Sequence, residues 1–444
     1  LVATTFLAGK EELEQAIEKG LSVRRELKHL PLYKRYKILM QISNTLQENK
    51  ASLALLLSKE SGKPMRYALG EIERASQSFL VAAEETKRIT NEYLALDWTA
   101  SGKGKEGLVK YFPIGLIAGI APFNFPLNLA VHKIAPAIAT GNPIILKPAR
   151  ATPLSVLELA KIIDKTDLPK GAVSILPMNR VSGNQLVTDS RFSKLSFTGS
   201  PQVGWLMKSK AGKKRITLEL GGNAGVLISK KADLERAVKK CLIGSFAYSG
   251  QVCIHVQRIY VESTVFDAFT KMMIQGTKQL KQGNPEDMDT DISSMIDENN
   301  AKRVASWVAD AVADGAQILC GGKRQGTYFE PTILTHTKPE MNVCRLEIFG
   351  PVVTIEKVAN FEEGIKAINA SDYGLQAGVF TDSIQEINQS FDELEVGGVI
   401  HNDVPTFRVD HMPYGGIKNS GFGREGIKYA MRDMLEAKLL VKDS

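Results

Sequence analysis

Apolar and polar residues divide the chain into a helical beginning and a long alternating remainder. Between residues 10 and 96, apolar positions recur every three to four residues in Tyr33–Leu57 and Met65–Ile89, with charged residues on the opposite face. This spacing predicts a mostly helical region. Short β-branched runs then alternate with amphipathic stretches. The predicted strands are Gly115–Ile120, Pro143–Leu146, Val173–Leu176, Leu195–Phe197 and Ile216–Glu219, and the predicted helices between them are Leu127–Ala139, Pro153–Lys165 and Pro201–Ala211.

Apolar strands joined by amphipathic crossovers predict an α/β fold, in which helices cover both faces of a parallel sheet. A second series of the same kind follows. Its predicted helices are Ala232–Phe246, Thr264–Leu280 and Asn300–Asp314, and its predicted strands are Arg258–Val261, Val352–Ile355, Ala377–Phe380 and Gly398–His401. Between them, the Asp-rich run Gly283–Ile296 predicts a surface loop. In such sheets, ligands gather at the carboxyl ends of the strands.

Two further segments predict strands that lie outside either sheet. Leu108–Phe112 follows the polar run Thr99–Glu106, and Leu439–Lys442 stands near the end of the chain. Paired with each other or with another subunit, these strands would form a small third module.

The composition is that of a globular protein, and it narrows the classes of ligand. A chain of 444 residues is long enough for two or three domains. The net charge of +7 is spread along the chain, because Lys and Arg alternate with Asp and Glu. The lack of a dense basic tract with interleaved aromatics argues against nucleic acid as a partner. A mildly positive field suits anionic small molecules such as a dinucleotide or a carboxylate.

The positions of cysteine, histidine and apolar residues lead to expectations about the cellular compartment, metal binding and membrane insertion. The four cysteines form no C-x-x-C pair and no metal-ligand spacing with the six histidines, so we expect reduced thiols, a cytoplasmic compartment and no metal site. The most apolar stretch, Leu116–Val131, is broken by proline and asparagine and predicts a buried strand and loop, not a membrane span. No signal peptide is visible, and because the chain opens at Leu1 without Met, we expect the natural chain to begin earlier.

A thiol and a carboxylate are the first candidates for chemistry. Cys253 stands among small and polar residues, and Glu219 precedes it by 34 positions in the run Glu219-Leu-Gly-Gly222. A thiolate can attack a substrate while a carboxylate handles a proton or a water. A core cysteine and an ordinary glycine turn are the simpler alternatives, so these two residues need support from other elements.

Polar side chains at other predicted strand ends provide that support. Asn124 lies in a loop made rigid by Pro122 and Pro126, where its amide can donate to a developing oxyanion, or can cap the helix that follows. Lys147 and Arg150 follow the next strand and can reach a ribose or a phosphate, or can be solvated cations.

Further candidates for a nucleotide site occur later in the chain. The run Phe197-Thr-Gly-Ser-Pro201 predicts a strand, a turn at Gly199 and a helix start at Ser200, where free N–H groups can hold a diphosphate, although it is not the G-x-G-x-x-G fingerprint. Gly221 permits close backbone approach to a ligand. Glu347 and Phe349 offer a carboxylate for ribose hydroxyls and a ring for a flat heterocycle, although a plain strand start also explains them.

Seven segments occur together and in one order: Pro-Phe-Asn124-Phe-Pro, Lys147-Pro, Phe-Thr-Gly-Ser200, Glu219-Leu-Gly-Gly, Gly-Gln-Val-Cys253, Glu347-Ile-Phe349-Gly-Pro and Pro-Tyr-Gly-Gly-Ile-Lys-Asn-Ser-Gly421. This set resembles the aldehyde dehydrogenase superfamily over nearly the whole chain. The resemblance implies a Rossmann-like cofactor domain in residues 1–98 and 114–220, an α/β catalytic domain in residues 221–430, and a small β oligomerisation module in residues 99–113 and 431–444.

The resemblance also implies a role for each motif residue. Cys253 would attack an aldehyde, Asn124 and the Cys253 backbone N–H would hold the oxyanion, and Glu219 would activate the water that hydrolyses the thioester. A nicotinamide cofactor, NAD or NADP, would accept the hydride. Lys147 and Glu347 would hold its two riboses, Ser200 its diphosphate, and Phe349 would pack near the nicotinamide. The residues expected to bind this cofactor are Pro122, Phe123, Lys147, Arg150, Gly199, Ser200, Gly221, Glu347 and Phe349.

Two departures from the family pattern, and one residue that follows it, refine the expectations about the cofactor and the product. Many relatives have Trp at the position of Phe123, which alters the shape of the pocket but leaves the oxyanion role untouched. Many NAD-preferring relatives have Glu at the position of Arg150, and an Arg cannot accept ribose hydrogen bonds but favours a 2′-phosphate. We therefore expect NADP to be used at least as well as NAD. Relatives that form acyl-CoA commonly lack the deacylating Glu, and Glu219 favours hydrolysis to the free acid.

The substrate expectation depends on the resemblance to one branch. Val399–Pro413 and Gly250–Arg258 look most like the lactaldehyde dehydrogenase branch, which handles short oxygenated aldehydes. Val252 stands where relatives that act on phosphorylated aldehydes often have Arg. His132 and Arg408 are the candidate substrate residues, although a histidine within a predicted helix is more often a satisfied, partly buried one. Arg408 can grip a carboxylate, which keeps a succinate-semialdehyde type of substrate open as the alternative, or can be an exposed loop cation. A homodimer or homotetramer suits the family, and a binding or scaffold protein without catalysis is the alternative from another class.

Overall fold

The computed structural model describes residues 2–443, so that Leu1 and Ser444 of the expected end segments lie outside the described residues. Three sheets of three or more strands organise this part of the chain, beside two small two-stranded sheets. The first sheet has six strands, parallel except for its antiparallel edge strand β19. In spatial order the strands are β19 (Gly421–Phe422), β7 (Arg215–Glu219), β6 (Lys194–Thr198), β3 (Ile117–Ile120), β4 (Ile144–Lys147) and β5 (Val173–Ile175). The helices that follow its strands are α5 (Pro126–Thr140), α6 (Leu154–Asp164), α7 (Arg180–Thr188) and α8 (Pro201–Lys210).

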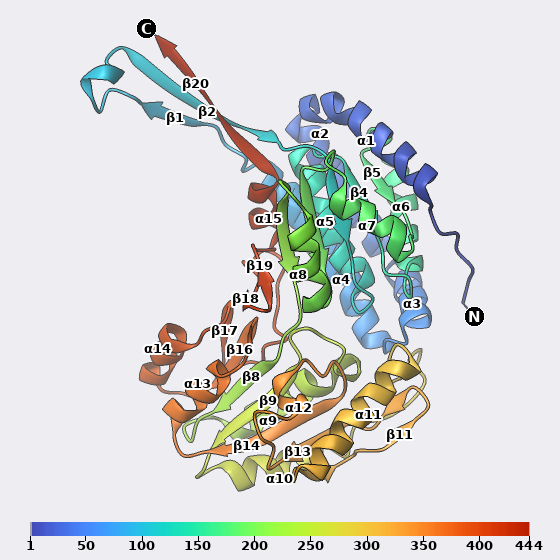
Figure 1. Ribbon diagram of the computed structural model, residues 1–444, viewed down its shortest axis with the longest axis vertical. Helices are drawn as coiled ribbons and strands as arrows, with labels where there is room; N and C mark the ends of the chain where they lie inside the picture. Colours follow the sequence, from blue (N-terminus) through green and yellow to red (C-terminus); the bar gives the residue numbers. More distant parts are fainter. Residues whose placement is uncertain (1, 444) are drawn as a thin grey trace.

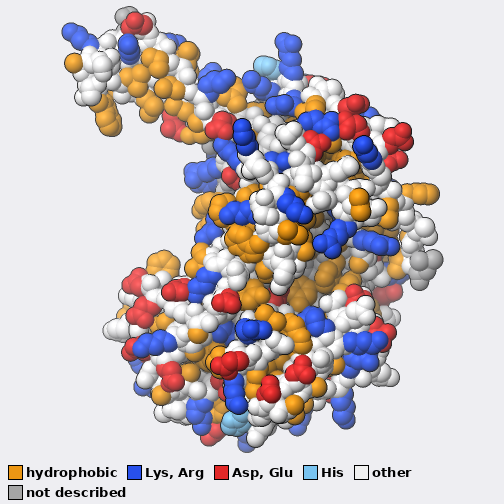
Figure 2. All heavy atoms as spheres, in the orientation of Figure 1, with side chains coloured by type: hydrophobic (Ala, Val, Ile, Leu, Met, Phe, Trp, Pro, Cys, Tyr) orange, Lys and Arg blue, Asp and Glu red, His pale blue; other side chains and the backbone are white. Residues whose placement is uncertain are grey.

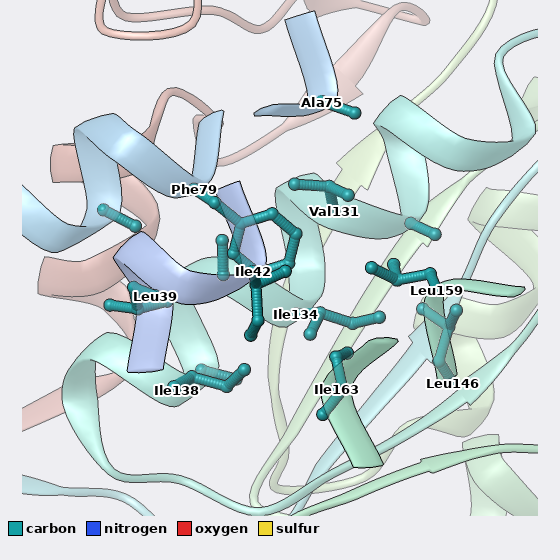
Figure 3. Close-up of a cluster of buried hydrophobic side chains, with 14 of the residues drawn as sticks. Leu39, Ile42, Ala75, Phe79, Val131, Ile134, Ile138, Leu146, Leu159 and Ile163 are labelled. Atoms are coloured by element: carbon teal, nitrogen blue, oxygen red, sulfur yellow. The ribbon is translucent and has the colours of Figure 1, made fainter. Parts of the chain in front are cut away.

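Four helices begin the chain: α1 (Lys10–His29), α2 (Leu32–Glu48), α3 (Lys50–Ser61) and α4 (Met65–Thr86). Helix α1 packs against β4 and β5, and the other three pack against α5, α6 and one another. Their apolar faces share one core with α5 and α6, in which Phe79 of α4 lies against Ile42 of α2 and beside Ile134 of α5 (Figure 3). The expected helical region is thus present, except at its end. Glu92–Ala95 forms strand β1, because it pairs with a neighbouring strand and exposes all four residues.

The second sheet has seven strands, of which only the edge strand β10 is antiparallel to its neighbour. In order they are β10 (Gln317–Cys320), β13 (Thr332–Thr335), β14 (Val352–Val358), β9 (Val256–Glu262), β8 (Ala224–Ile228), β16 (Gln376–Phe380) and β17 (Gly398–His401). The larger helices of this part are α9 (Leu234–Phe246), α10 (Phe266–Thr277), α11 (Glu298–Ala313), α13 (Phe361–Asn369) and α14 (Ile384–Glu393). Strand β8 is buried near the centre of the sheet, although the periodicity alone did not predict it.

The third sheet is an arm that projects from the rest of the molecule (Figure 1). It contains β1, β2 (Lys105–Pro113) and β20 (Leu435–Asp443), and β2 pairs with β20 along its whole length. Helix α15 (Ile427–Asp433) precedes β20, which contains the predicted strand Leu439–Lys442 and begins before it, at Leu435. The short elements are η1 (Ala100–Gly102), η2 (Ala247–Gly250), β11 (Arg324–Gln325), β12 (Tyr328–Phe329), α12 (Asn342–Arg345), β15 (Tyr373–Gly374) and β18 (Ile417–Lys418).

The two larger sheets meet through a short connection. Only residues 220–223 separate the end of β7 from the start of β8, so the chain leaves one sheet and enters the next almost at once. Most of the predicted site residues line a cavity that also includes Leu220 and Gly221 of this connection. Within residues 2–443, no helix combines the length and the apolar character that crossing a membrane requires.

Candidate active site

Most of the predicted site residues line one cavity of about 570 Å³. Its walls come from both large sheets and include Pro122, Phe123, Asn124, Gly199, Ser200, Glu219, Gly221, Cys253, Glu347 and Phe349. A larger hollow of about 810 Å³ lies between α2, α3 and α6, and none of the predicted site residues lines it among those described. The cavity between the sheets is therefore the candidate site.

Two glycines allow the parts of this cavity to approach one another. Glu219 is the last residue of β7, and the two glycines follow Leu220. A Cβ at Gly222 would stand 2.1 Å from the carbonyl oxygen of Cys253, and a Cβ at Gly221 would stand 2.4 Å from Oε2 of Glu347. Since real Cβ atoms cannot approach so closely, the Gly-Gly pair brings the carboxylate, the thiol loop and the Glu347 segment together.

The loop before Cys253 has an unusual backbone that aims the thiol into the cavity. Tyr248, Ser249 and Gly250 all have positive φ, of 51°, 52° and 68°. Left-handed conformations at residues other than glycine are strained and occur often at functional sites. Sγ of Cys253 lies 3.3 Å from Oη of Tyr414. Burial raises the pKa of the Cys253 thiol to about 11, against the hydrogen bond from Tyr414, which lowers it.

Asn124 is held by a buried ion pair. Its Nδ2 donates to the carbonyl of Gln251 at 3.0 Å, which leaves the second amide hydrogen for another acceptor. The backbone carbonyl of Asn124 accepts from Nζ of Lys63 at 2.7 Å, and Lys63 is paired with Glu71. The same Glu71 accepts from the backbone N–H groups of Leu127 and Asn128 at the start of α5. One buried carboxylate thus fixes both the helix start and the loop that carries Asn124.

Glu219 carries a carboxylate without a hydrogen-bond partner among residues 2–443. The residue is only 3% exposed. Burial and the nearby carboxylate of Glu425 raise its pKa well above the ordinary value, while Arg408 and Lys133 oppose that shift. A buried acid with a raised pKa and free lone pairs can accept a proton at neutral pH more readily than an exposed one.

The opposite end of the cavity offers groups suited to a dinucleotide. Ser200 is the N-cap of the ten-residue helix α8, and among the described residues no side chain caps the first-turn N–H groups, which remain available to an anion. The rings of Phe123 and Phe349 meet edge to face at 5.7 Å, and Phe349 has a φ of 46°. Oε1 of Glu347 accepts from the N–H of Gly222 at 3.0 Å. Burial raises the pKa of Glu347 to about 7.

Gln257 holds the Glu347 segment in place. The side chain of this β9 residue is buried. Its Nε2 donates to the carbonyls of Val343 and Leu346, and its Oε1 accepts from the N–H of Ile348 at 3.0 Å. Nη2 of Arg303 donates to the carbonyl of Ile348 as well, at 2.9 Å. A polar side chain in the second sheet therefore positions a wall of the cavity.

Four predicted site residues do not line this cavity in the described part of the chain: Lys147, Arg150, His132 and Arg408. Lys147 ends β4 and is half-buried, and Arg150 is exposed close to the cavity residue Ala149. His132 is buried in α5, where its ring nitrogens face Asp410 at 2.8 Å and Glu425 at 3.1 Å. Both ring nitrogens of His132, a candidate substrate residue from the sequence, therefore have partners inside the protein.

Arg408 belongs to the same buried network but reaches toward the thiol. Its Nη2 lies 2.7 Å from Nδ1 of His132 and 3.2 Å from Oε2 of Glu425. Its guanidinium stacks on the ring of Tyr414, with the carbon 3.5 Å from the ring centroid. Arg408 therefore lies on the ring whose hydroxyl contacts Cys253, and its charge lowers the pKa of that thiol.

Several residues of the site escaped the sequence analysis: Tyr414, Lys133, Glu425, Lys63 and Glu71. Lys133 donates to Glu425 at 2.9 Å and to Thr198 at 2.7 Å, both within the buried network. Tyr414 does stand within the glycine-rich run that carries the resemblance. The buried charges gave no such signal, because Lys and Glu on a helix look the same in sequence whether they face solvent or a partner.

By itself, this arrangement is that of an α/β protein with a thiol, an unpartnered carboxylate and an amide in one cavity between two sheets. Comparison with known proteins makes the class specific. The aldehyde dehydrogenase family model matches residues 1–440. The 3-sulfolactaldehyde dehydrogenase of Priestia aryabhattai is 42% identical over 441 residues, covering 99% of this chain and 92% of that protein. The lactaldehyde dehydrogenase of Methanococcus aeolicus is 42% identical over 439 residues, covering 97% and 92%.

Solved structures agree with the sequence relatives. The structure of aldehyde dehydrogenase 21 from Physcomitrella patens, in complex with the reaction product succinate, has a TM-score of 0.97 at 44% identity and covers 98% of this chain and 91% of that chain. The structure of glyceraldehyde-3-phosphate dehydrogenase GapN from Methanocaldococcus jannaschii, complexed with NADP, has a TM-score of 0.95 at 39% identity and covers 100% and 97%. The chain belongs to the aldehyde dehydrogenase family, which confirms the family and the fold predicted from the motifs.

Proposed function

We propose that the protein oxidises a small hydroxylated aldehyde to its carboxylic acid, with NAD(P) as oxidant and Cys253 as nucleophile. The observation that carries this proposal is the shared cavity, in which Cys253, Asn124 and Glu219 lie together with the open N-terminus of α8 and the carboxylate of Glu347. The six-stranded unit would bind the cofactor, and the seven-stranded unit would supply the thiol.

The first step is addition of the Cys253 sulfur to the aldehyde carbon. With a pKa of about 11 in the buried site, the thiol must lose its proton to a base during the attack. Glu219 fits that role, because burial raises its pKa and so its affinity for a proton. As the carbonyl oxygen gains charge, the free amide hydrogen of Asn124 and the Cys253 N–H would stabilise it.

The addition gives a thiohemiacetal, and once its carbon has lost a hydride a thioester remains, so the second step is hydrolysis of that thioester. A bound nicotinamide dinucleotide would supply the hydride acceptor, held by the α8 N-terminus at its diphosphate and by Glu347 at a ribose. After passing the proton of the first step to solvent, Glu219 would take a proton from water, whose oxygen attacks the thioester carbon. The acid leaves, and the Cys253 sulfur recovers a proton. The same carboxylate thus serves both steps.

Glu219→Gln tests this division of labour. Because the proposal gives both proton transfers to this carboxylate, the variant should slow the first release of NAD(P)H as well as the steady-state turnover, by about 10² to 10⁴, which is the usual contribution of a general base. Glu356→Gln, which changes a carboxylate of β14 outside the cavity, is the matched control. A Glu219→Gln enzyme with normal steady-state turnover contradicts the role. If coenzyme A restored turnover and appeared in the product, acyl-CoA formation would replace hydrolysis.

Cys253→Ser separates the enzyme from a binding or scaffold protein. We expect aldehyde-dependent NAD(P)H formation to disappear in this variant and to persist in Cys344→Ser, whose thiol lies outside the cavity. Wild-type protein that forms no NAD(P)H with any aldehyde of a broad panel would favour the scaffold alternative.

Preference for NADP is proposed from Arg150. This exposed side chain forms no ion pair within residues 2–443 and follows the cavity residue Ala149 directly. A free guanidinium suits a 2′-phosphate, and the similar GapN structure contains NADP. Arg150→Glu should therefore lower the ratio of kcat/KM with NADP to that with NAD by tenfold or more, which is about 1.4 kcal/mol. An unchanged ratio contradicts this assignment.

The substrate class is proposed from the relatives named for lactaldehyde and 3-sulfolactaldehyde. The semialdehyde alternative is supported by the succinate in the moss structure and by Arg408, whose Nε has no hydrogen-bond partner among the described residues. Against it, the guanidinium is already paired with Glu425. Lactaldehyde should exceed succinate semialdehyde in kcat/KM. Loss of activity only on the acidic substrate in Arg408→Ala, with that substrate preferred by the wild type, would reverse the choice.

Oligomerisation and compartment belong to the same proposal. The arm exposes large apolar residues on a two-faced sheet, and Figure 2 shows apolar side chains gathered over it. Tyr93, Leu94 and Leu440 are 65%, 39% and 52% exposed. Such a surface suits another copy of the chain, as a homodimer or homotetramer. Residues 2–443 contain four cysteines and no disulfide, which suits a reducing, cytoplasmic compartment.

A further inference from the structure

Tyr414 is the side chain hydrogen-bonded to the sulfur of Cys253, and the proposed mechanism gives it no role. Its Oη lies 3.3 Å from Sγ, the only hydrogen bond of that sulfur within residues 2–443. The residue is 3% exposed. Its backbone is clamped by two hydrogen bonds with Glu425, one in each direction, at 3.0 and 2.6 Å. The hydroxyl is therefore held at a fixed place beside the nucleophile.

Arg408 covers one face of the Tyr414 ring. The guanidinium carbon stands 3.5 Å from the ring centroid, and Glu425 and His132 hold Nη2 on the other side. A cation on the face of an aromatic ring is attracted to its π electrons. The same charge draws electron density from the phenol, which makes the O–H a stronger donor.

The charges around Cys253 oppose one another. Glu347 and Glu219 disfavour a thiolate, whereas Arg408 and the Tyr414 hydroxyl favour it. Burial raises the pKa of Tyr414 well above its ordinary value, so the phenol keeps its proton. Once the sulfur is a thiolate it can only accept, and the Tyr414 O–H is the side-chain donor in place.

We propose that Tyr414 is a positioning residue for the nucleophile: its hydroxyl donates a hydrogen bond to the Cys253 thiolate, and Arg408 stacked on its ring strengthens that donor. This inference rests on the proposed role of Cys253. In this proposal, Tyr414 and Arg408 together orient the sulfur of Cys253. They also stabilise the negative charge of the thiolate, which burial otherwise disfavours.

Alkylation of Cys253 by iodoacetamide tests the proposal without turnover. The alkylation rate is measured against pH, and mass spectrometry identifies the alkylated residue. Because a hydrogen bond to a charged group favours that form by roughly a factor of 10 to 100, Tyr414→Phe should move the midpoint of the alkylation curve up by about one to two pH units. It should also lower kcat by a similar factor while KM for the aldehyde changes little. Tyr328→Phe, which removes a phenol hydroxyl from strand β12, is the matched control and should change neither the alkylation midpoint nor kcat.

A second variant distinguishes donation from shape. Tyr414→difluorotyrosine keeps the ring and the hydroxyl but makes the phenol a stronger donor, so the alkylation midpoint should move down. It also remains informative if Tyr414→Phe does not fold. An unchanged midpoint in the Phe variant, or an upward shift in both variants, overturns the proposal. Failure of the proposed function has other signatures, whatever the Tyr414 variants do to alkylation: either the wild-type protein forms no NAD(P)H with any aldehyde, or Cys253→Ser still oxidises aldehyde.

Discussion

The buried Lys63–Glu71 pair makes a prediction that joins stability to catalysis. Both side chains are fully buried. Nζ of Lys63 also donates to the carbonyl of Asn124 at 2.7 Å and lies over the ring of Phe125, 3.8 Å from its centroid. Lys63→Met keeps the length of the side chain and removes the charge. Glu71 would then remain as a buried carboxylate with only backbone N–H donors.

The size of the effect follows from that unpaired charge. Removing one partner of a buried ion pair destabilises a protein by about 3–5 kcal/mol, because the other charge stays desolvated. Glu71→Leu should be more severe, because it also deprives Leu127 and Asn128 of their acceptor, at about 1–3 kcal/mol for each buried N–H left unpaired. The double variant should be less destabilised than the sum of the two, because neither charge remains.

Urea unfolding followed by fluorescence measures the free energies, and kcat measures the catalytic effect. Loss of the Lys63 donor frees the Asn124 loop, and a shift of about 1 Å in such a group lowers kcat by roughly 10². Lys50→Met is the matched control, since Lys50 pairs with Glu73 on the surface at 2.8 Å and should contribute less than about 1 kcal/mol. If Lys63→Met were as mild as Lys50→Met in both assays, the reasoning about the buried pair would be wrong.

Two further predictions concern pH and shape. Burial lowers the pKa of His255 from 6.5 to about 4, so its contribution to stability is complete above pH 6.5 and should be lost as the pH falls to 4, by about 3 kcal/mol. His255→Gln should flatten the dependence of the unfolding midpoint on pH in that window, and an equally steep curve in the variant argues against it. Gly221→Ala places a Cβ 2.4 Å from Oε2 of Glu347. The variant should raise KM for the cofactor about tenfold with little change in KM for the aldehyde. Unchanged cofactor kinetics would contradict the close approach of the two residues.

The parts of the site that could be predicted are those with a local signature. Asn124 sits between two prolines, Glu219 precedes a Gly-Gly pair, and Ser200 begins a helix beside Pro201. Each signature restricts the backbone within a few residues, so it survives in the sequence without knowledge of the rest of the chain. Strand β8 had no such signature, because a short buried run of Ala224–Ile228 has no period of its own to distinguish it.

Contacts between distant residues could not be predicted in the same way. Tyr414 reaches Cys253 across 161 positions, and His132 meets Glu425 across 293. The sequence left His132 as either a substrate residue or a satisfied, partly buried histidine, because nothing near it shows that two carboxylates from elsewhere face its ring. The strand β1 was similarly hidden, since its partner lies in β2 and its residues face solvent.

The order of residues along the chain therefore determined the family, the fold and the kinds of reactive group, since thiol, carboxylate and amide each occur in a motif short enough to recognise. The tertiary structure alone decided which groups share the cavity and which are satisfied internally. Electrostatic and hydrogen-bonding effects act over a few ångströms of space, and only packing brings an arginine, a tyrosine and a cysteine from separate segments within that range.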